Sequence, residues 1–213
     1  MELAEKASDA SAKTKAYAAA QSNYQKAVMA KNGGEVVQSQ ALLRLGESQG
    51  FLEDWKSSQK TYRQFIQVYA KSKHKLLRNA WQGLGWAQEN QKNHAEAIIS
   101  YRKVTEELRK DELGARAQFH IGECHLKLAR ATDDKGARGN AFKEAIKAYA
   151  YVEANYPEEV STPKGVWQAR SMLGMGTALK ESGNSAVAQE ILEELVSKYP
   201  DSNAATIAKE LIK

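Results

Sequence analysis

The stretch Trp81-Gln82-Gly83-Leu84-Gly85 decides the fold, together with Ala97-Ile98-Ile99-Ser100-Tyr101 that follows it. Apolar residues in this part of the chain recur at intervals of three and four, which predicts amphipathic helices. A glycine inside a helix costs about 1 kcal/mol relative to alanine, so Gly85 needs a packing reason. A glycine on one helix and a small residue such as Ala97 on the next allow the two helices to approach closely. We therefore interpret residues 75–110 as a helical hairpin.

The same register recurs along the chain, which predicts a repeat architecture. A large aliphatic residue followed by glycine occurs four times, at Leu45-Gly46, Leu84-Gly85, Ile121-Gly122 and Leu173-Gly174. Further along the chain, each of these pairs is followed by a large residue at an equivalent place in the pattern. A small residue stands four positions before that large residue. The large residues are Tyr62, Tyr101, Tyr149 and Leu192, and the small ones are Ser58, Ala97, Ala145 and Ala188. Four agreeing registers argue against coincidence.

This pattern resembles the tetratricopeptide repeat (TPR), in which Trp-x-x-Leu-Gly is followed by Ala-x-x-x-Phe/Tyr and then by Pro. The resemblance implies an all-α fold, a right-handed TPR-like α-solenoid of antiparallel helix hairpins. We expect a single TPR-like domain over residues 1–213. Its elements are a lead helix at 3–31, hairpins at about 35–71, 75–110, 112–157 and 164–200, and a terminal capping helix at 202–213.

The ends of the array carry their own signals. We expect Tyr17, Tyr24 and Val28 on the buried face of the lead helix. Asn32-Gly33-Gly34 should end that helix, because glycine commonly follows a helix C-terminus. Asp201-Ser202 should cap the terminal helix, because serine and aspartate side chains accept hydrogen bonds from the first free backbone amides.

The spacing departs from a plain repeat in the third hairpin. Consecutive glycines of the register lie 39, 37 and 52 residues apart. The extra residues fall at 131–140, where we expect both helices to lengthen and a loop to protrude. The connection at 158–165 is also long, and loops of this kind either carry function or are merely tolerated.

The composition is that of a folded protein. The chain has 213 residues, with 31 Lys and Arg against 26 Asp and Glu, a formal net charge of +5. A single Cys excludes a disulfide scaffold, and no stretch approaches the roughly 20 apolar residues of a membrane span. A basic run comprises Lys71, Lys73, His74, Lys75 and Arg78. We interpret it as a solvated connection between helices, so nucleic-acid binding is not favoured.

The compartment stays open at this point. The N-terminus shows neither the basic nor the apolar region of a signal peptide, which fits a cytoplasmic protein or a chain whose targeting segment was removed. Tyr-Pro-Asp-Ser-Asn-Ala-Ala at 199–205 is similar to the ends of bacterial envelope repeat proteins. These are the TolA-binding coordinator family and the outer-membrane-assembly lipoprotein with TPR units, whose lipidation cysteine and coiled-coil N-terminus are missing here. The resemblance slightly favours a periplasmic or envelope-associated location over the cytoplasm.

No catalytic signature is visible, and we expect no enzyme activity, cofactor or metal. None of the four histidines is paired with a nucleophile in a known arrangement. His120 and Cys124 are four residues apart, which is compatible with metal binding, but no further ligand is evident nearby. We interpret them as ordinary helix residues.

The expected function is binding of a partner protein or peptide. The resemblance implies that the first helices of the hairpins line a concave groove. Trp86 could instead pack against a neighbouring hairpin, Phe119 fits a core better than a groove, and Met175 could simply fill a gap. The alternative is a structural scaffold subunit, docked through its convex face or ends into a larger assembly, for which the envelope is one candidate location. The candidate partner-binding residues are Leu43, Glu47, Asn79, Gln82, Trp86, Arg116, Phe119, Glu123, Gln168, Ser171 and Met175. Gln40 holds the remaining groove position of the first hairpin.

Overall fold

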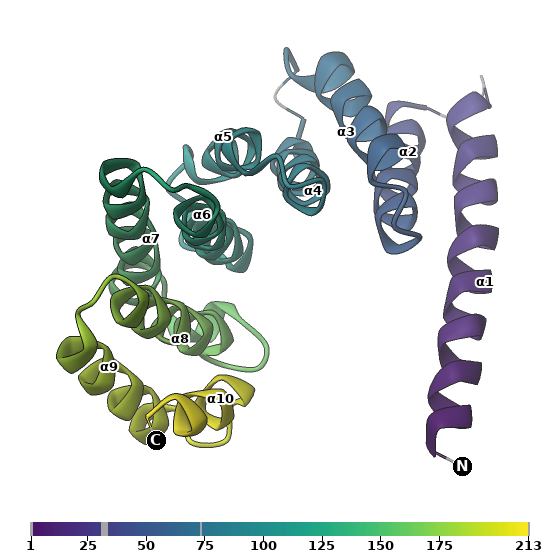
Figure 1. The fold of residues 1–213 in the computed structure, drawn as a ribbon. Coiled ribbons are helices and arrows are strands. Elements are labelled where there is room, and N and C mark those ends of the chain that lie inside the picture. Colours follow the sequence, from purple (N-terminus) through teal and green to yellow (C-terminus); the bar gives the residue numbers. More distant parts are fainter. Residues whose placement is uncertain (1, 31–33, 73, 213) are drawn as a thin grey trace. The chain divides into compact units, whose positions relative to one another are not determined.

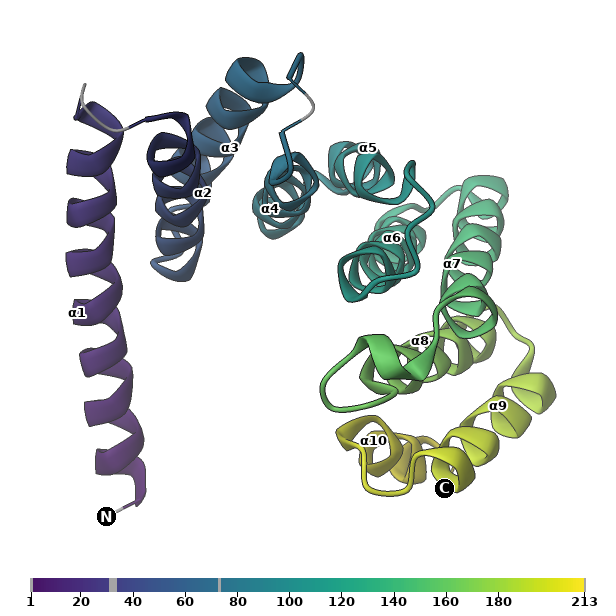
Figure 2. The same cartoon turned by 180° about the vertical axis from the view of Figure 1, so that it is seen from behind.

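The computed structural model describes residues 2–30, 34–72 and 74–212, with side chains described from residue 11 onward. All regular structure in these ranges is helical, so the all-α class of helical hairpins is confirmed (Figures 1 and 2). No helix in the described part of the chain is long and apolar enough to cross a membrane. The elements are α1 (Glu2–Met29), α2 (Glu35–Phe51), α3 (Trp55–Tyr69), α4 (Leu77–Asn90), α5 (His94–Thr105), α6 (Glu112–Ala131), α7 (Lys135–Asn155), the 3-10 turn η1 (Glu158–Val160), α8 (Val166–Glu181), α9 (Ser185–Lys198) and α10 (Asn203–Leu211).

The helices form two compact units, Met1–Asn93 and His94–Lys213. Unit 1 contains α1 to α4, and unit 2 contains α5 to α10. Within each unit every helix packs against the next one along the chain. One continuous repeat domain over the whole chain therefore remains a proposal.

In unit 1, Tyr62 of α3 lies between glycines of two other helices. A Cβ atom added to Gly46 of α2 would come within 2.8 Å of the Tyr62 ring, and one added to Gly83 of α4 would also collide with that ring. Ser58 donates a hydrogen bond of 2.8 Å to the carbonyl oxygen of Gly46. The predicted close approach of Gly46 to a small residue and a tyrosine is therefore confirmed.

In unit 2, Tyr149 of α7 repeats this arrangement. A Cβ atom added to Gly122 of α6 would lie 2.6 Å from its ring, and one added to Gly174 of α8 would lie 2.5 Å from it. The tyrosine therefore joins its own hairpin to the next one. The sequence paired Gly174 with Leu192 instead, and this was wrong, because Leu192 packs on Gly176 at 2.7 Å.

The insertion of the third hairpin is absorbed by its helices. α6 has 20 residues and α7 has 21, as the sequence predicted. The protruding loop was wrong, because only residues 132–134 join the two helices. Asp134 caps α7 by accepting from the amide of Ala137 at 2.6 Å, and the Arg138 guanidinium donates to the Thr132 carbonyl oxygen at 2.7 Å. These bonds hold the connection tight.

The lead helix packs through the face that the sequence indicated. Tyr17, Tyr24 and Val28 are half-buried, and the ring of Tyr17 stacks on Phe51 of α2 with centroids 4.6 Å apart. The helix ends at Met29. Asn32 and Gly33 of the predicted helix end lie outside the described residues. Lys73 of the basic run also lies outside them.

At the other end, Ser202 caps α10 as predicted, accepting a hydrogen bond of 3.0 Å from the amide of Ala205.

Substitution Ser202→Ala removes this acceptor and should lower the free energy of unfolding by about 1 kcal/mol. Urea unfolding followed by circular dichroism measures the change. Ser185→Ala is the matched control, because Ser185 is an exposed first-turn serine of α9. Equal effects of the two substitutions would contradict a specific role of the cap.

Candidate partner-binding groove

A groove of about 390 Å³ opens on unit 2 between α6, α8 and α10. Side chains three or four residues apart share one face of a helix, and each of the three helices turns one such stripe to the groove. The lining combines apolar side chains with a substantial share of polar and charged groups. The lining residues are Phe119, Glu123, Leu126 and Arg130 of α6, Val166, Ala169, Arg170, Leu173, Gly174 and Thr177 of α8, and Ser202, Asn203, Ala204 and Ile207 at α10.

The two arginines of the groove differ in what they bind. Arg130 donates two hydrogen bonds to Glu181, at 2.9 and 2.5 Å, and this carboxylate raises the pKa of Arg130. Arg170 lies over the Trp167 ring, 5.1 Å from its centroid, and forms no ion pair with any described residue. Arg170 is therefore the cation that the groove can offer to an anionic group.

Glu123 is held at the edge of the groove by Tyr149. The tyrosine hydroxyl donates to the Glu123 carboxylate at 2.5 Å. The pKa of Tyr149 lies well above its ordinary value, first because the ring is buried and second because the Glu123 carboxylate lies beside it. Glu123 therefore supports the core more directly than it could recognise a ligand.

The structure places only two of the predicted groove residues in this groove, Phe119 and Glu123. The three predicted on α8 lie in the interior instead. Gln168 and Ser171 are each 1% exposed, and the Gln168 amide donates to the Tyr156 carbonyl oxygen at 2.7 Å. Met175 is packed in a core cluster of α6, α7 and α8. These three predictions are corrected, because that face of α8 packs on the preceding hairpin.

The predicted residues of unit 1 are also largely internal. Leu43 belongs to the core around Tyr62, and Gln82 is buried. Trp86 packs between Phe51 and Trp55, with ring centroids 5.5 and 4.8 Å away. The interpretation of Trp86 as a packing residue is therefore the better one.

The remaining predicted residues are neither gathered in the groove nor wholly buried. Glu47 is half-buried and pairs with Arg44 at 2.7 Å. Asn79 and Arg116 are half-buried, and Gln40 is exposed. Their role in binding stays a prediction.

Sequence reasoning missed the residues of α8 and α10 that do line the groove. Arg170 stands three residues before Leu173, the place that Trp81 holds in the second hairpin, and its side chain is exposed. The available signal was the spacing of Val166, Arg170, Leu173 and Thr177, an apolar stripe interrupted by polar residues. The family register concealed it.

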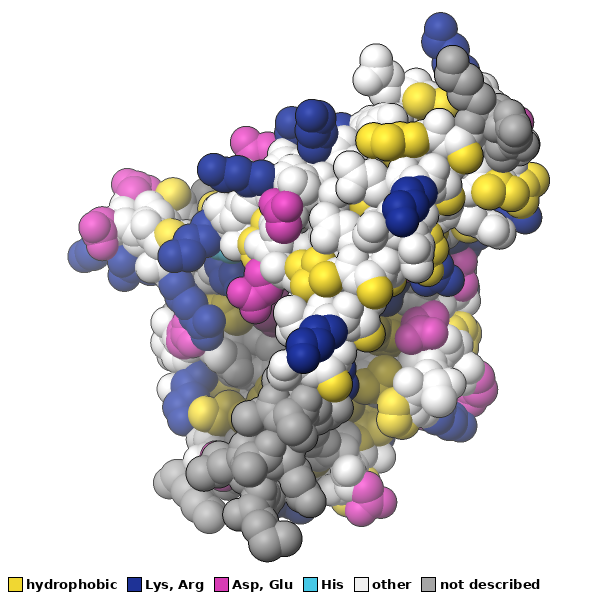
Figure 3. All heavy atoms as spheres, turned by 90° about the vertical axis from the view of Figure 1, so that its right-hand side faces the viewer, with side chains coloured by type: hydrophobic (Ala, Val, Ile, Leu, Met, Phe, Trp, Pro, Cys, Tyr) yellow, Lys and Arg dark blue, Asp and Glu magenta, His cyan; other side chains and the backbone are white. Residues whose placement is uncertain are grey.

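No group of three or more potential metal ligands occurs among the described residues, and Cys124 is fully buried. On the face shown in Figure 3, basic side chains are interspersed with acidic ones rather than gathered into a patch. Arg78 of the basic run is buried rather than solvated.

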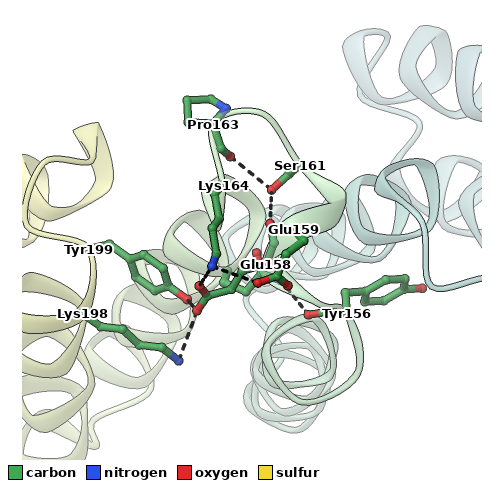
Figure 4. Close-up of polar contacts among 9 residues, drawn as sticks. Tyr156, Glu158, Glu159, Ser161, Pro163, Lys164, Lys198 and Tyr199 are labelled. Atoms are coloured by element: carbon green, nitrogen blue, oxygen red, sulfur yellow. Dashed lines mark hydrogen bonds and ion pairs between the residues drawn. The ribbon is translucent and has the colours of Figure 1, made fainter.

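The long connection at 158–165 is tied to the end of α9 (Figure 4). The Tyr199 hydroxyl donates to Glu158 at 2.6 Å, and Lys164 pairs with Glu159 at 2.9 Å. Burial and then Glu158 raise the pKa of Tyr199. The connection is thus fixed both within itself and to the end of α9, which supports the position of α8 at the groove.

Comparisons with known proteins agree with this architecture. Sequence models described as "Tetratricopeptide repeat" match residues 40–72, 79–107 and 170–202, so the chain contains tetratricopeptide repeats. The crystal structure of BtubC (BKLC) from P. vanneervenii is similar, with a TM-score of 0.57 and 12% identity over 91% of this chain and 74% of that chain. This likeness concerns the fold alone. A search of curated proteins finds no match, and the finer resemblance to envelope families is not supported.

Proposed function

We propose that the chain is a non-catalytic protein-interaction module that holds a short segment of a partner protein in the groove of α6, α8 and α10. Tetratricopeptide repeats generally mediate protein–protein interaction. The observation that carries the proposal is the groove itself, in which an apolar wall meets an arginine that has no ion-pair partner among the described residues. Together these features fit a ligand that has both apolar and anionic groups.

The wall supplies the apolar part of the recognition. Leu173 is half-buried and Ile207 is 40% exposed, so both still have surface to lose to a ligand. Burial of apolar surface contributes about 25 cal/mol per Å². Arg170 is prearranged by its contact with Trp167, which lowers the entropy lost when a carboxylate binds it. Arginine is also among the residues that most often dominate interface energy.

Selection of random peptides displayed on phage against the full chain tests this proposal. We expect the selected peptides to combine apolar with acidic residues. Substitution Arg170→Ala should weaken a selected peptide about tenfold, the equivalent of 1.4 kcal/mol. Fluorescence anisotropy measures the affinity.

The matched control is Arg109→Ala, because Arg109 is an exposed arginine of the same unit outside the groove, paired with Glu107 at 2.7 Å. It should leave the affinity unchanged. Ile207→Asp should abolish binding while the helical content stays constant. Peptides whose affinity is unchanged by both Arg170→Ala and Ile207→Asp would place recognition elsewhere.

The scaffold alternative rests on a different observation. Met29, Val36 and Val37, where α1 is joined to α2, are 71%, 57% and 52% exposed. A protruding loop at 131–140 would also have offered a docking element, but only residues 132–134 join α6 and α7. Light scattering of the chain, alone and with lysate, separates the two functions, since a scaffold subunit should be recovered in a stable larger assembly.

A periplasmic or envelope-associated location stays a prediction from the terminal resemblance. Fractionation of cells that express the full open reading frame is its test.

A further inference from the structure

A second depression, of about 310 Å³, lies on unit 2 between α5, α6 and α7, and it uses a different face of α6 from the groove. His125 lines this depression and lies six residues along α6 from Phe119 of the groove. Because successive residues of an α-helix are turned by about 100°, this spacing places the two side chains on different faces of α6. We call this depression the basic notch. Its polar lining comprises Arg102, Thr105, Gln118, His125, Glu144, Lys147 and Tyr151, with Ile121 and Ala148 at the apolar positions.

The charges of the basic notch are only partly balanced within the protein. Lys147 donates to Glu144 at 2.8 Å, so these two groups neutralise each other. Arg102 has no carboxylate in ion-pair contact among the described residues. His125 likewise has no hydrogen-bond partner there. The notch therefore holds more cationic side chains than carboxylates, with Arg102 close enough to Glu144 to help lower the pKa of that carboxylate, and with the His125 imidazole beside them.

Arg102 and His125 repel each other when both are charged. Burial first, and then Arg102, hold the pKa of His125 below its ordinary value, while Glu144 of α7 acts in the opposite direction. The pKa of Glu144 is itself lowered, first by its hydrogen bond from Lys147. The free protein therefore disfavours the charged imidazole, and an anion placed between Arg102 and His125 would favour its protonation.

We propose that the basic notch binds a phosphoryl dianion, with Arg102 as the permanent cation and His125 as the second cation, protonated when the anion binds. Two charges on the ligand match these two cations and leave the Lys147–Glu144 pair intact. A monovalent carboxylate would be satisfied by Arg102 alone and would leave His125 neutral. Arginine is well suited to phosphate because its planar fork donates two parallel hydrogen bonds.

Sulfate is the first probe, because it remains a dianion throughout the relevant pH range. The ring resonances of His125, assigned with the His125→Gln variant, report binding in NMR titrations of the full chain at constant ionic strength. We expect a saturable shift and an affinity about tenfold higher at roughly pH 5.5 than at pH 7.5, because binding takes up a proton at His125. Acetate should give no such pH dependence.

The direction of this pH dependence follows from proton linkage. The free folded chain disfavours the charged imidazole, so stability from this group is present above its unfolded pKa and is lost as pH falls below it. A bound dianion favours the charged imidazole, so binding takes up a proton and strengthens as pH falls. Isothermal titration calorimetry with sulfate needs no histidine resonance, and by this measurement His125→Gln should keep the binding found at high pH and lose its pH dependence.

Arg102→Gln should weaken sulfate binding at least tenfold, whereas Arg109→Gln should not change it. Inorganic phosphate and a short phosphoserine peptide then distinguish the two sources of a phosphoryl group, since tighter binding of the peptide assigns the notch to a modified protein. The same weak, unsaturable shift in the wild type and in Arg102→Gln would overturn the proposal. Because no residue is shared with the groove, Arg170→Ala should leave sulfate binding intact, so the two proposals can fail independently.

Discussion

Substitution Tyr149→Ala should lower the free energy of unfolding of unit 2 by about 3–5 kcal/mol, the range measured when buried aromatic residues are truncated. The Tyr149 ring is fully buried and contacts the glycine positions of two different helices, Gly122 and Gly174. Its removal leaves a cavity between α6 and α8 and frees the Glu123 carboxylate from its hydrogen bond. Urea unfolding monitored by circular dichroism measures the loss.

Tyr151→Ala is the matched control for this experiment. Tyr151 lies on the same helix, two residues further along, and its side chain is 41% exposed. Surface substitutions of this kind usually change stability by no more than about 0.5 kcal/mol. Tyr149→Phe should lie between the two, at a loss of about 1–2 kcal/mol, because it keeps the ring and removes only the hydrogen bond to Glu123. Similar losses of unfolding free energy from Tyr149→Ala and Tyr151→Ala would falsify the role of Tyr149 in joining α6 to α8.

Substitution Gly122→Ala should destabilise unit 2 by about 1–3 kcal/mol, although alanine favours helices more than glycine does. The added methyl group would lie 2.6 Å from the Tyr149 ring. That ring cannot retreat, because Gly174 meets it from the other helix. Thermal and urea unfolding of the variant measure the effect.

Gly139→Ala is the control, since Gly139 lies within α7 and a Cβ atom there would have no neighbour within 4 Å. It should stabilise the chain by up to about 1 kcal/mol through helix propensity alone. A double variant, Gly122→Ala with Tyr149→Leu, should lose less than the sum of its single variants, because the smaller side chain makes room for the methyl group. Strict additivity would contradict direct contact between the two positions.

The sequence predicted most of the fold because its signals are local. Helix periodicity, Ser202 as a cap and the recurrence of glycine before a tyrosine each depend on residues close together in the chain. The contact of Gly46 with Tyr62 and the contact of Gly122 with Tyr149 each join the two helices of a single hairpin, where the repeat register applies. Gly174 differed, because its contact with Tyr149 belongs to the packing of one hairpin on another.

The groove was harder to predict for the same reason. The face of α8 that remains open depends on how α8 packs against α6 and α7, and these contacts join residues far apart in the chain. The register therefore assigned Gln168, Ser171 and Met175 to the groove, whereas packing buries them and exposes Arg170. Ile207 of the terminal helix lies outside the repeat pattern altogether.

The position of Tyr149 also sets limits on how such a chain can be recombined. A chimera cut between α7 and α8 would separate this tyrosine from Gly174, even though that cut follows the visible boundary between hairpins. Exchange of α7 together with α8 keeps the pair intact. The natural module for shuffling or for engineered lengthening is therefore offset by one helix from the hairpin, and Tyr62 with Gly83 defines the corresponding module in unit 1.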